Sequence, residues 1–281
     1  MKNKGIIPIN KAKDWTSFDV VNKLKYKLKP LKAGHLGTLD PMATGVLLVT
    51  VGKATKLFDI MQEKRKTYIA TFEFGYQTDT LDSTGKTIDY CDTIPTEEEI
   101  NLILPKFIGK ISQIPPKYSA KSVNGSRAYD LARQGIDFKL KAKEVEIYSI
   151  TILSYSNKIL KLEIECGSGT YIRSIGRDIA KELNSMATMI DLVRTKVGEI
   201  TIDRCFNISE IEEIEEKILP IQDFLNYEIL DITNEQKSKL LNGQTIVIDK
   251  TDGLYKLNED YDTIALVQIN GNKAKMSLFL G

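Results

Sequence analysis

The sequence predicts an α+β protein whose C-terminal end forms a small, β-rich domain. Helix-like and strand-like patterns are mixed along the first 222 residues. After Asp223 the pattern changes to short strands separated by Gly and Asn turns. We therefore expect one large domain over residues 1–222 and a second, smaller one over 226–281.

The first predicted helix begins at Thr16-Ser-Phe-Asp19, which has the form of a capping box. Its apolar stripe consists of Val20, Val21, Leu24 and Leu28. Residues 46–51 are almost continuously apolar, which is typical of a buried strand. Residues 67–74 alternate between apolar and polar types and predict a second strand.

The middle of the chain predicts one more helix and a basic loop region. Residues 78–85 read as a polar loop, and the glutamates after Thr96 favour a helix over 95–107. A basic stretch that contains Tyr and Gly then runs to Lys143, with Asn124-Gly125 as a turn signal.

The last third predicts a strand over 159–166, a helix over 174–183 and a glutamate-rich helix over 210–219 that ends near Pro220. In the C-terminal domain, Asn270-Gly271 predicts a hairpin turn. The strands expected there are 245–248, 263–269 and 273–280.

Composition limits the class of protein. Apolar residues make up 42% and charged residues 27%, as in ordinary globular proteins. The longest apolar run, 46–51, is too short for a membrane span, and no apolar segment follows the N-terminal Met-Lys-Asn-Lys. The three cysteines are far apart and His35 is the only histidine. We therefore expect no membrane association, no metal site and a cytoplasmic protein.

The net charge of +1 conceals an uneven distribution. Residues 1–40 contain nine basic and three acidic side chains, residues 106–143 nine and two, and residues 205–281 seven and fourteen. Basic segments suit a polyanionic partner such as nucleic acid, although lysine runs are also common on solvated helix faces.

Two short sequences resemble nucleotide-binding loops but lack the required spacing. Gly52-Lys53-Ala54 and Gly85-Lys86-Thr87 are not preceded by the glycine that a P-loop needs. No cofactor is therefore expected.

The segment Gly34 to Gly45 is the most informative one. It contains three glycines, His35 and the pair Asp40-Pro41 within twelve residues. Glycines allow a ligand to approach the backbone, and Pro41 fixes the path after Asp40. Such a loop could be a plain turn, or it could present a carboxylate and an imidazole to a bound ligand.

The motif as a whole resembles the active-site motif of TruB-type tRNA pseudouridine synthases. Similar matches occur in the same order along the chain, at 10–21, 34–56, 66–85, 113–125, 169–178 and 192–198. The first match departs from the family at Ala12 and Asp14, where proline and glycine are usual.

This resemblance implies a pseudouridine synthase fold with a mixed, largely antiparallel sheet, a thumb-like RNA-binding insertion at about 113–143 and a PUA-like C-terminal domain. It also implies that the chain converts uridine 55 in the T-loop of tRNA to pseudouridine, without a cofactor. Two alternatives stay open, namely a guide-RNA-dependent synthase and an RNA-binding or tRNA-folding protein without catalysis. A monomer is expected, because no apolar repeat indicates a self-association face.

The resemblance also assigns roles to single residues. Asp40 is the catalytic carboxylate, Arg173 holds the pKa of that carboxylate down, and Tyr68 stacks on the flipped base near C5. Whether Asp40 attacks C1′, attacks C6 or assists a glycal intermediate stays open. Further contacts are expected from His35, Tyr171 and Leu192 to the substrate, and from Lys117, Lys121, Arg127 and the N-terminal lysines to the RNA backbone.

Overall fold

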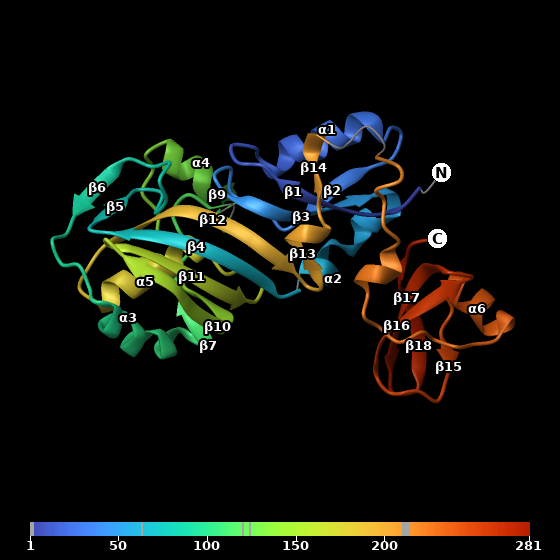
Figure 1. Ribbon diagram of the computed structural model, residues 1–281. Helices are drawn as coiled ribbons and strands as arrows, with labels where there is room; N and C mark the ends of the chain where they lie inside the picture. The colour runs from blue at the N-terminus through green and yellow to red at the C-terminus, as the bar shows by residue number, and fades with distance from the viewer. Residues whose placement is uncertain (1–2, 63, 120, 124, 210–213) are drawn as a thin grey trace.

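The computed structural model describes residues 3–62, 64–119, 121–123, 125–209 and 214–281. One long mixed sheet forms the body of the molecule, and a separate smaller sheet follows at the C-terminal end (Figure 1). The strands of the long sheet are, in order, β14 (Phe206–Asn207), β1 (Gly5–Lys11), β3 (Thr44–Val51), β12 (Ala187–Val197), β4 (Lys66–Phe74), β11 (Ile159–Cys166), β10 (Lys143–Ser156) and β7 (Gly109–Gln113).

Neighbouring strands in this sheet are mostly antiparallel. The exceptions are β1 with β14 and β3 with β12. Two short strands lie beside this path: β2 (Ala33–Leu36) pairs with β3, and β13 (Ile200–Thr201) pairs with β12. The prediction of a mixed, largely antiparallel sheet is confirmed.

Successive side chains of β3 enter different cores, because side chains alternate across a strand. Leu47 and Val49 belong to a cluster shared with the helices α1 (Ser17–Lys27) and α5 (Ile172–Glu182). Val46 and Leu48 belong to a second cluster on the other face. That face carries η1 (Gly52–Leu57), α2 (Phe58–Gln62) and η5 (Ile221–Phe224).

Several local predictions are confirmed. Thr16 caps α1 in a capping box with Asp19, and the predicted strands at 67–74 and 159–166 are β4 and β11. The predicted helix at 174–183 is α5, which begins two residues earlier. The predicted helix at 95–107 is α3 (Glu97–Ile103), which continues as a 3-10 turn, η2 (Leu104–Phe107), where Pro105 lacks a backbone donor.

The helix predicted over 210–219 is wrong for the residues that the structure describes there, and 210–213 lie outside them. Residues 214–217 form a turn, and Leu219 exchanges two backbone hydrogen bonds with Ile6 of β1, at 2.9 and 3.0 Å. Ile214 and Ile218 are buried in the core of the long sheet. Tertiary pairing with β1 therefore outweighs the helix propensity of the glutamates.

The insertion between β7 and β10 carries β8 (Ser122–Val123), β9 (Ser126–Arg127) and α4 (Ala128–Arg133). Asn124 of the predicted Asn124-Gly125 turn lies outside the described residues. The polar loop at 78–85 connects β5 (Tyr76–Thr78) with β6 (Thr87–Tyr90). No helix in the described part of the chain is long and apolar enough to cross a membrane.

The C-terminal sheet has the order β15 (Ile246–Val247), β18 (Lys273–Phe279), β17 (Asp262–Asn270) and β16 (Gly253–Glu259). It packs with α6 (Asn234–Leu241) around its own apolar cluster, as a PUA-like domain would. The hairpin between β17 and β18 turns at Gly271 and Asn272, one residue later than predicted, and both have positive φ. Neither β16 nor α6 was predicted.

Candidate active site

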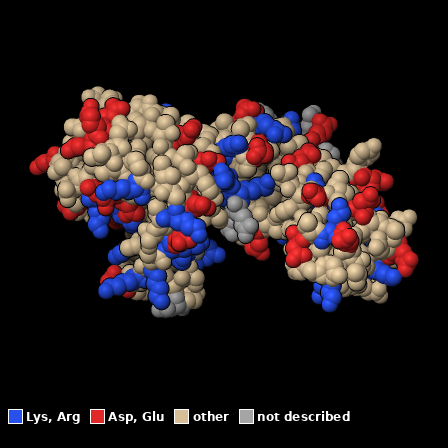
Figure 2. Space-filling view, turned by 90° about the horizontal axis from the view of Figure 1, so that it is seen from below, with Lys and Arg blue, Asp and Glu red and all other residues tan. Residues whose placement is uncertain are grey.

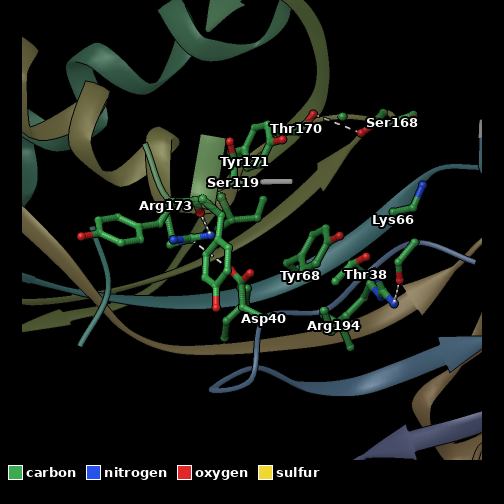
Figure 3. A pocket seen from close by; sticks show the side chains of 18 of the residues that line it. Thr38, Asp40, Lys66, Tyr68, Ser119, Ser168, Thr170, Tyr171, Arg173 and Arg194 are labelled. Atoms are coloured by element: carbon green, nitrogen blue, oxygen red, sulfur yellow. Dashed lines mark hydrogen bonds and ion pairs between the residues drawn. The ribbon is translucent and has the colours of Figure 1, made fainter. Parts of the chain in front are cut away.

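A cavity of about 390 Å³ opens where the long sheet meets the insertion and the start of α5 (Figure 3). Its lining comes from five parts of the chain that are separated in sequence, namely 37–40, 66–68, 118–129, 167–173 and 192–194. Asp40 and Tyr68 lie on one side, and Tyr171 and Arg173 come from the start of α5. Its volume falls in the range of sites that bind small ligands.

The loop that carries Asp40 is fastened to the first turn of α1. The Ser17 hydroxyl accepts from the Leu39 N–H at 2.9 Å and donates to the Leu39 carbonyl at 3.2 Å. The buried Lys11 ammonium donates to the carbonyl of Pro41 at 3.1 Å. These bonds fix the backbone on both sides of Asp40.

Arg173 pairs with Asp40. Its Nε lies 3.0 Å from Asp40 Oδ2, and its Nη1 lies 3.2 Å from Oδ2 of Asp82. Nη1 also donates to the carbonyl of Thr80 at 2.9 Å, and Nη2 to the carbonyl of Tyr118 at 3.1 Å. The Arg173 side chain is buried, whereas that of Asp40 is 35% exposed. A rigid, buried cation thus holds a carboxylate that solvent can still reach.

Burial raises the pKa of Asp40, and the negative charge of Asp82 acts in the same direction. The Arg173 guanidinium lowers the pKa, as expected from the sequence, but its effect is smaller than that of burial. The carboxyl of Asp40 therefore ionises at a higher pH than an ordinary aspartate.

Tyr68 stands on β4 beside the cavity, directly across from Arg194 on β12. Burial raises the pKa of its phenol, and the contact with the Arg194 guanidinium opposes that rise. At neutral pH the phenol is therefore protonated. Tyr68 offers the cavity an aromatic ring and a hydroxyl.

Two cations of the cavity had no role assigned to them from the sequence. Arg194 is buried, and donates from Nε to the Val46 carbonyl at 2.7 Å and from Nη2 to the Gly37 carbonyl at 3.0 Å. Lys66 is also buried, and burial together with the charge of Arg194 lowers the pKa of its ammonium to about 8. Both lie inside motifs of the predicted family, so the sequence contained a signal for them.

Some of the other residues predicted to contact the substrate or the RNA line the cavity, and others lie outside it. Tyr171, Leu192 and Arg127 line the cavity, and the side-chain amide of Gln113 fixes the Tyr171 backbone through bonds of 2.8 and 3.2 Å. Lys117 is on the surface of the insertion, where it pairs with Asp137, and Lys121 also lies in the insertion.

His35 is placed differently from the other predicted substrate contacts. It lies on β2 opposite Val49 and is not among the residues that line the cavity. Its Nδ1 is buried and has no hydrogen-bond partner among the described residues. Burial lowers the pKa of its imidazole, which favours the neutral form. Within the described residues, no group of three or more His, Cys, Asp or Glu side chains could hold a metal ion.

Comparisons with known proteins identify the family of this chain. Residues 23–172 match the model of the family described as TruB family pseudouridylate synthase (N terminal domain). A Parabacteroides distasonis protein named tRNA pseudouridine synthase B is 44% identical over 227 residues, which are 78% of this chain and 96% of the relative. A Mycoplasma mobile protein of the same name is 38% identical over 281 residues, with 99% and 95% covered.

The fold is also found in solved structures. A chain in the structure of an H/ACA RNP bound to a substrate RNA containing 2′-deoxyuridine superposes with a TM-score of 0.74 at 20% identity. The match covers 99% of this chain and 85% of that chain, so it includes the C-terminal sheet. From the family match and the relatives along nearly its whole length, we conclude that this chain belongs to the TruB family of pseudouridylate synthases, which are isomerases.

Proposed function

We propose that this chain converts uridine 55 in the T-loop of tRNA to pseudouridine, with Asp40 as the catalytic residue. The name of the two relatives, tRNA pseudouridine synthase B, supports tRNA as the substrate. The observation that carries the role of Asp40 is its ion pair with the buried Arg173 at a cavity that Tyr68 also lines.

The reaction needs no net oxidation or reduction. The C1′–N1 bond breaks, C1′ bonds to C5, the proton leaves C5, and N1 gains a proton. Arg173 engages Oδ2 of Asp40, so we assign Oδ1 to the reacting nucleotide. Attack at C1′, attack at C6 and assistance to a glycal are all compatible with this placement. Each of them requires the ionised carboxylate.

A T-loop uridine has to leave its stack before it can reach Asp40. Unstacking costs a few kcal/mol, and an aromatic face offsets roughly 1–3 kcal/mol of that cost. In this proposal the ring of Tyr68 supplies that face. Its phenolic oxygen, beside the Arg194 guanidinium, accepts the C5 proton while the phenol's own proton passes to solvent water. Tyr171 and Leu192 enclose the base, because they line the same cavity.

We assign the electrostatic contacts with the RNA backbone to the basic side chains of the insertion. Residues 113–143 form the thumb-like part of a catalytic domain at 1–222, and 226–281 form the PUA-like domain. Arg127 lines the cavity, while Lys117 and Lys121 extend the basic surface outward. Blue side chains are prominent on the lobe that projects from the body in Figure 2. We propose that the enzyme acts as a monomer.

Tritium release tests the proposal. The substrate is T-loop RNA that carries uridine labelled at C5, and wild type is compared with Asp40→Asn. Release by wild type alone supports both the reaction and the role of Asp40. No release by wild type overturns the substrate, and release by both proteins overturns the catalytic assignment. RNA affinity measured for both proteins separates loss of chemistry from loss of binding.

A further inference from the structure

The outward side of α1 exposes two large aromatic side chains. Phe18 is 65% exposed and Tyr26 is 76% exposed. They lie on one face of the helix, since residues 18, 22, 25 and 26 follow the three- and four-residue spacing of α-helical neighbours. We call the exposed residues Phe18, Asn22, Lys25, Tyr26 and Lys29 the outer face of α1.

The opposite side of α1 is already used in folding. Val20, Val21 and Leu24 are buried in the core of the long sheet, together with Ile7 and Val49. Phe18 and Tyr26 point away from this core and do not contribute to it. Two large aromatic side chains that stay exposed on one helix face without serving the core are candidates for contact with a partner.

The charge around this face selects the class of partner. Residues 20–39 contain five lysines and no acidic residue. The ammonium of Lys29 lies 5.1 Å from the centre of the Tyr26 ring. Exposed aromatic rings interspersed with lysines are the combination that binds unpaired nucleotides, with the rings stacking on bases and the lysines contacting phosphates.

The outer face begins next to the active site. Ser17, which precedes Phe18, is bonded through its hydroxyl to the backbone of Leu39, the residue before Asp40. At the other end of the segment, the Lys32 carbonyl accepts from the Gly52 N–H at 2.7 Å, which places Lys32 beside Lys53. The outer face thus extends from the Asp40 loop, at its Phe18 end, to a second lysine-bearing segment, at its Lys29 end.

We propose that the outer face of α1 is a second RNA-binding surface, on which Phe18 and Tyr26 stack with unpaired bases of the same tRNA and Lys25 and Lys29 contact its phosphates. The proposal rests on the proposed function for the identity of the RNA. Eight residues separate the two rings, which is about 12 Å along a helix. The two rings therefore stack with bases that are not neighbours in one continuous stack. Such bases become available in a tRNA loop that loses its pairing with the T-loop when the T-loop binds in the active site.

The test compares three double variants in binding to full-length unmodified tRNA over a range of salt concentrations. Phe18→Ala with Tyr26→Ala removes the rings, and Lys25→Ala with Lys29→Ala removes the charges. Tyr90→Ala with Tyr261→Ala is the matched control, because both tyrosines are highly exposed and belong to parts of the fold that lie away from α1, namely β6 and the turn between β16 and β17 (Figure 1). All six positions are on the surface, so folding is retained.

Loss of the rings should weaken tRNA binding about tenfold or more while the salt dependence stays unchanged. Loss of the two lysines should reduce the slope of log affinity against log salt by about two. In both variants KM for isomerisation should rise, and kcat at saturating tRNA should stay at the wild-type value, because the outer face does not line the cavity.

A loss of affinity in the ring variant that is no greater than in the control overturns the proposal, even if the lysine variant binds more weakly. The outcome is independent of the chemistry, because binding is measured directly. If wild type fails to release tritium from T-loop RNA but the ring variant still loses tRNA affinity, the proposed reaction fails and the binding surface stands.

Discussion

Asp40 and Asp82 lie on two sides of one guanidinium, that of Arg173, at 3.0 and 3.2 Å. Asp82 is the buried member of the pair, and its Oδ1 accepts hydrogen bonds from Thr80 and Thr84. It therefore acts on Asp40 in two ways. It anchors the arginine that faces Asp40, and its negative charge raises the pKa of the Asp40 carboxyl.

Replacing Asp82 by Asn separates these two effects. Removal of the charge should lower the pKa of Asp40, so the rise of kcat on the acid side should move to lower pH. The plateau should fall about tenfold or more, because the guanidinium loses an anchor. The measurement is kcat against pH for T-loop RNA. Asp89→Asn, at an exposed position on β6, should leave the profile unchanged, and an acid limb of D82N at higher pH than that of wild type would contradict the argument.

Asp40→Asn should make the folded protein more stable at neutral pH. Because burial raises the pKa of Asp40 above its value in the unfolded chain, the folded state binds a proton more tightly, and ionisation at higher pH lowers stability. Asparagine does not ionise, and its amide oxygen can still accept from Arg173. The gain in unfolding temperature should shrink as the pH is lowered towards 3.8, the ordinary value of aspartate. A variant that unfolds below wild type at pH 7 would refute this.

Lys66 should set an alkaline limit on RNA binding. Its pKa of about 8 means that the ammonium loses its charge as the pH rises through that value in the folded enzyme. KM for wild type should therefore increase above about pH 8, because the cavity loses a positive charge that attracts the RNA. Lys66→Gln should show a raised KM that no longer changes in this range. Lys161→Gln, at an exposed position on β11, is the control and should behave as wild type.

Gly176 lets α5 approach the sheet. A Cβ at this position would lie 2.2 Å from Cε1 of Phe72, a core residue of β4. Gly176→Ala should therefore destabilise the protein by about 1–3 kcal/mol and lower activity, since Arg173 stands one turn earlier on the same helix. Urea unfolding measures the first effect and tritium release the second. An exposed change on α5, Lys181→Ala, should alter neither.

Local sequence patterns were sufficient to predict those helices and strands whose conformation is determined by their own residues. The capping box at Thr16 and the alternation over 67–74 and 159–166 each correspond to the element found. The helix prediction was wrong for 214–219 because the form of this segment depends on a distant partner. Its backbone bonds to Ile6, at the far end of the chain, and nothing in the local sequence indicates that partner.

The candidate site shows the same division. Motifs identified Asp40, Tyr68 and Arg173, and the structure brings all three to one cavity. The ion pair between Arg173 and Asp82 was not predicted, because it depends on how the 78–85 loop folds against α5. His35 shares a motif with Asp40 but lies on a strand, so proximity in sequence did not place it at the cavity.

The bond from Arg173 Nη2 to the Tyr118 carbonyl connects the active site to the insertion. The cation that faces Asp40 is thereby held partly by the segment assigned to gripping the RNA. Any shift of residue 118 away from α5 removes one acceptor from this guanidinium and changes the electrostatic environment of the carboxylate. If the proposed function holds, binding of RNA by the insertion and the reactivity of the Asp40 carboxylate are coupled through Arg173.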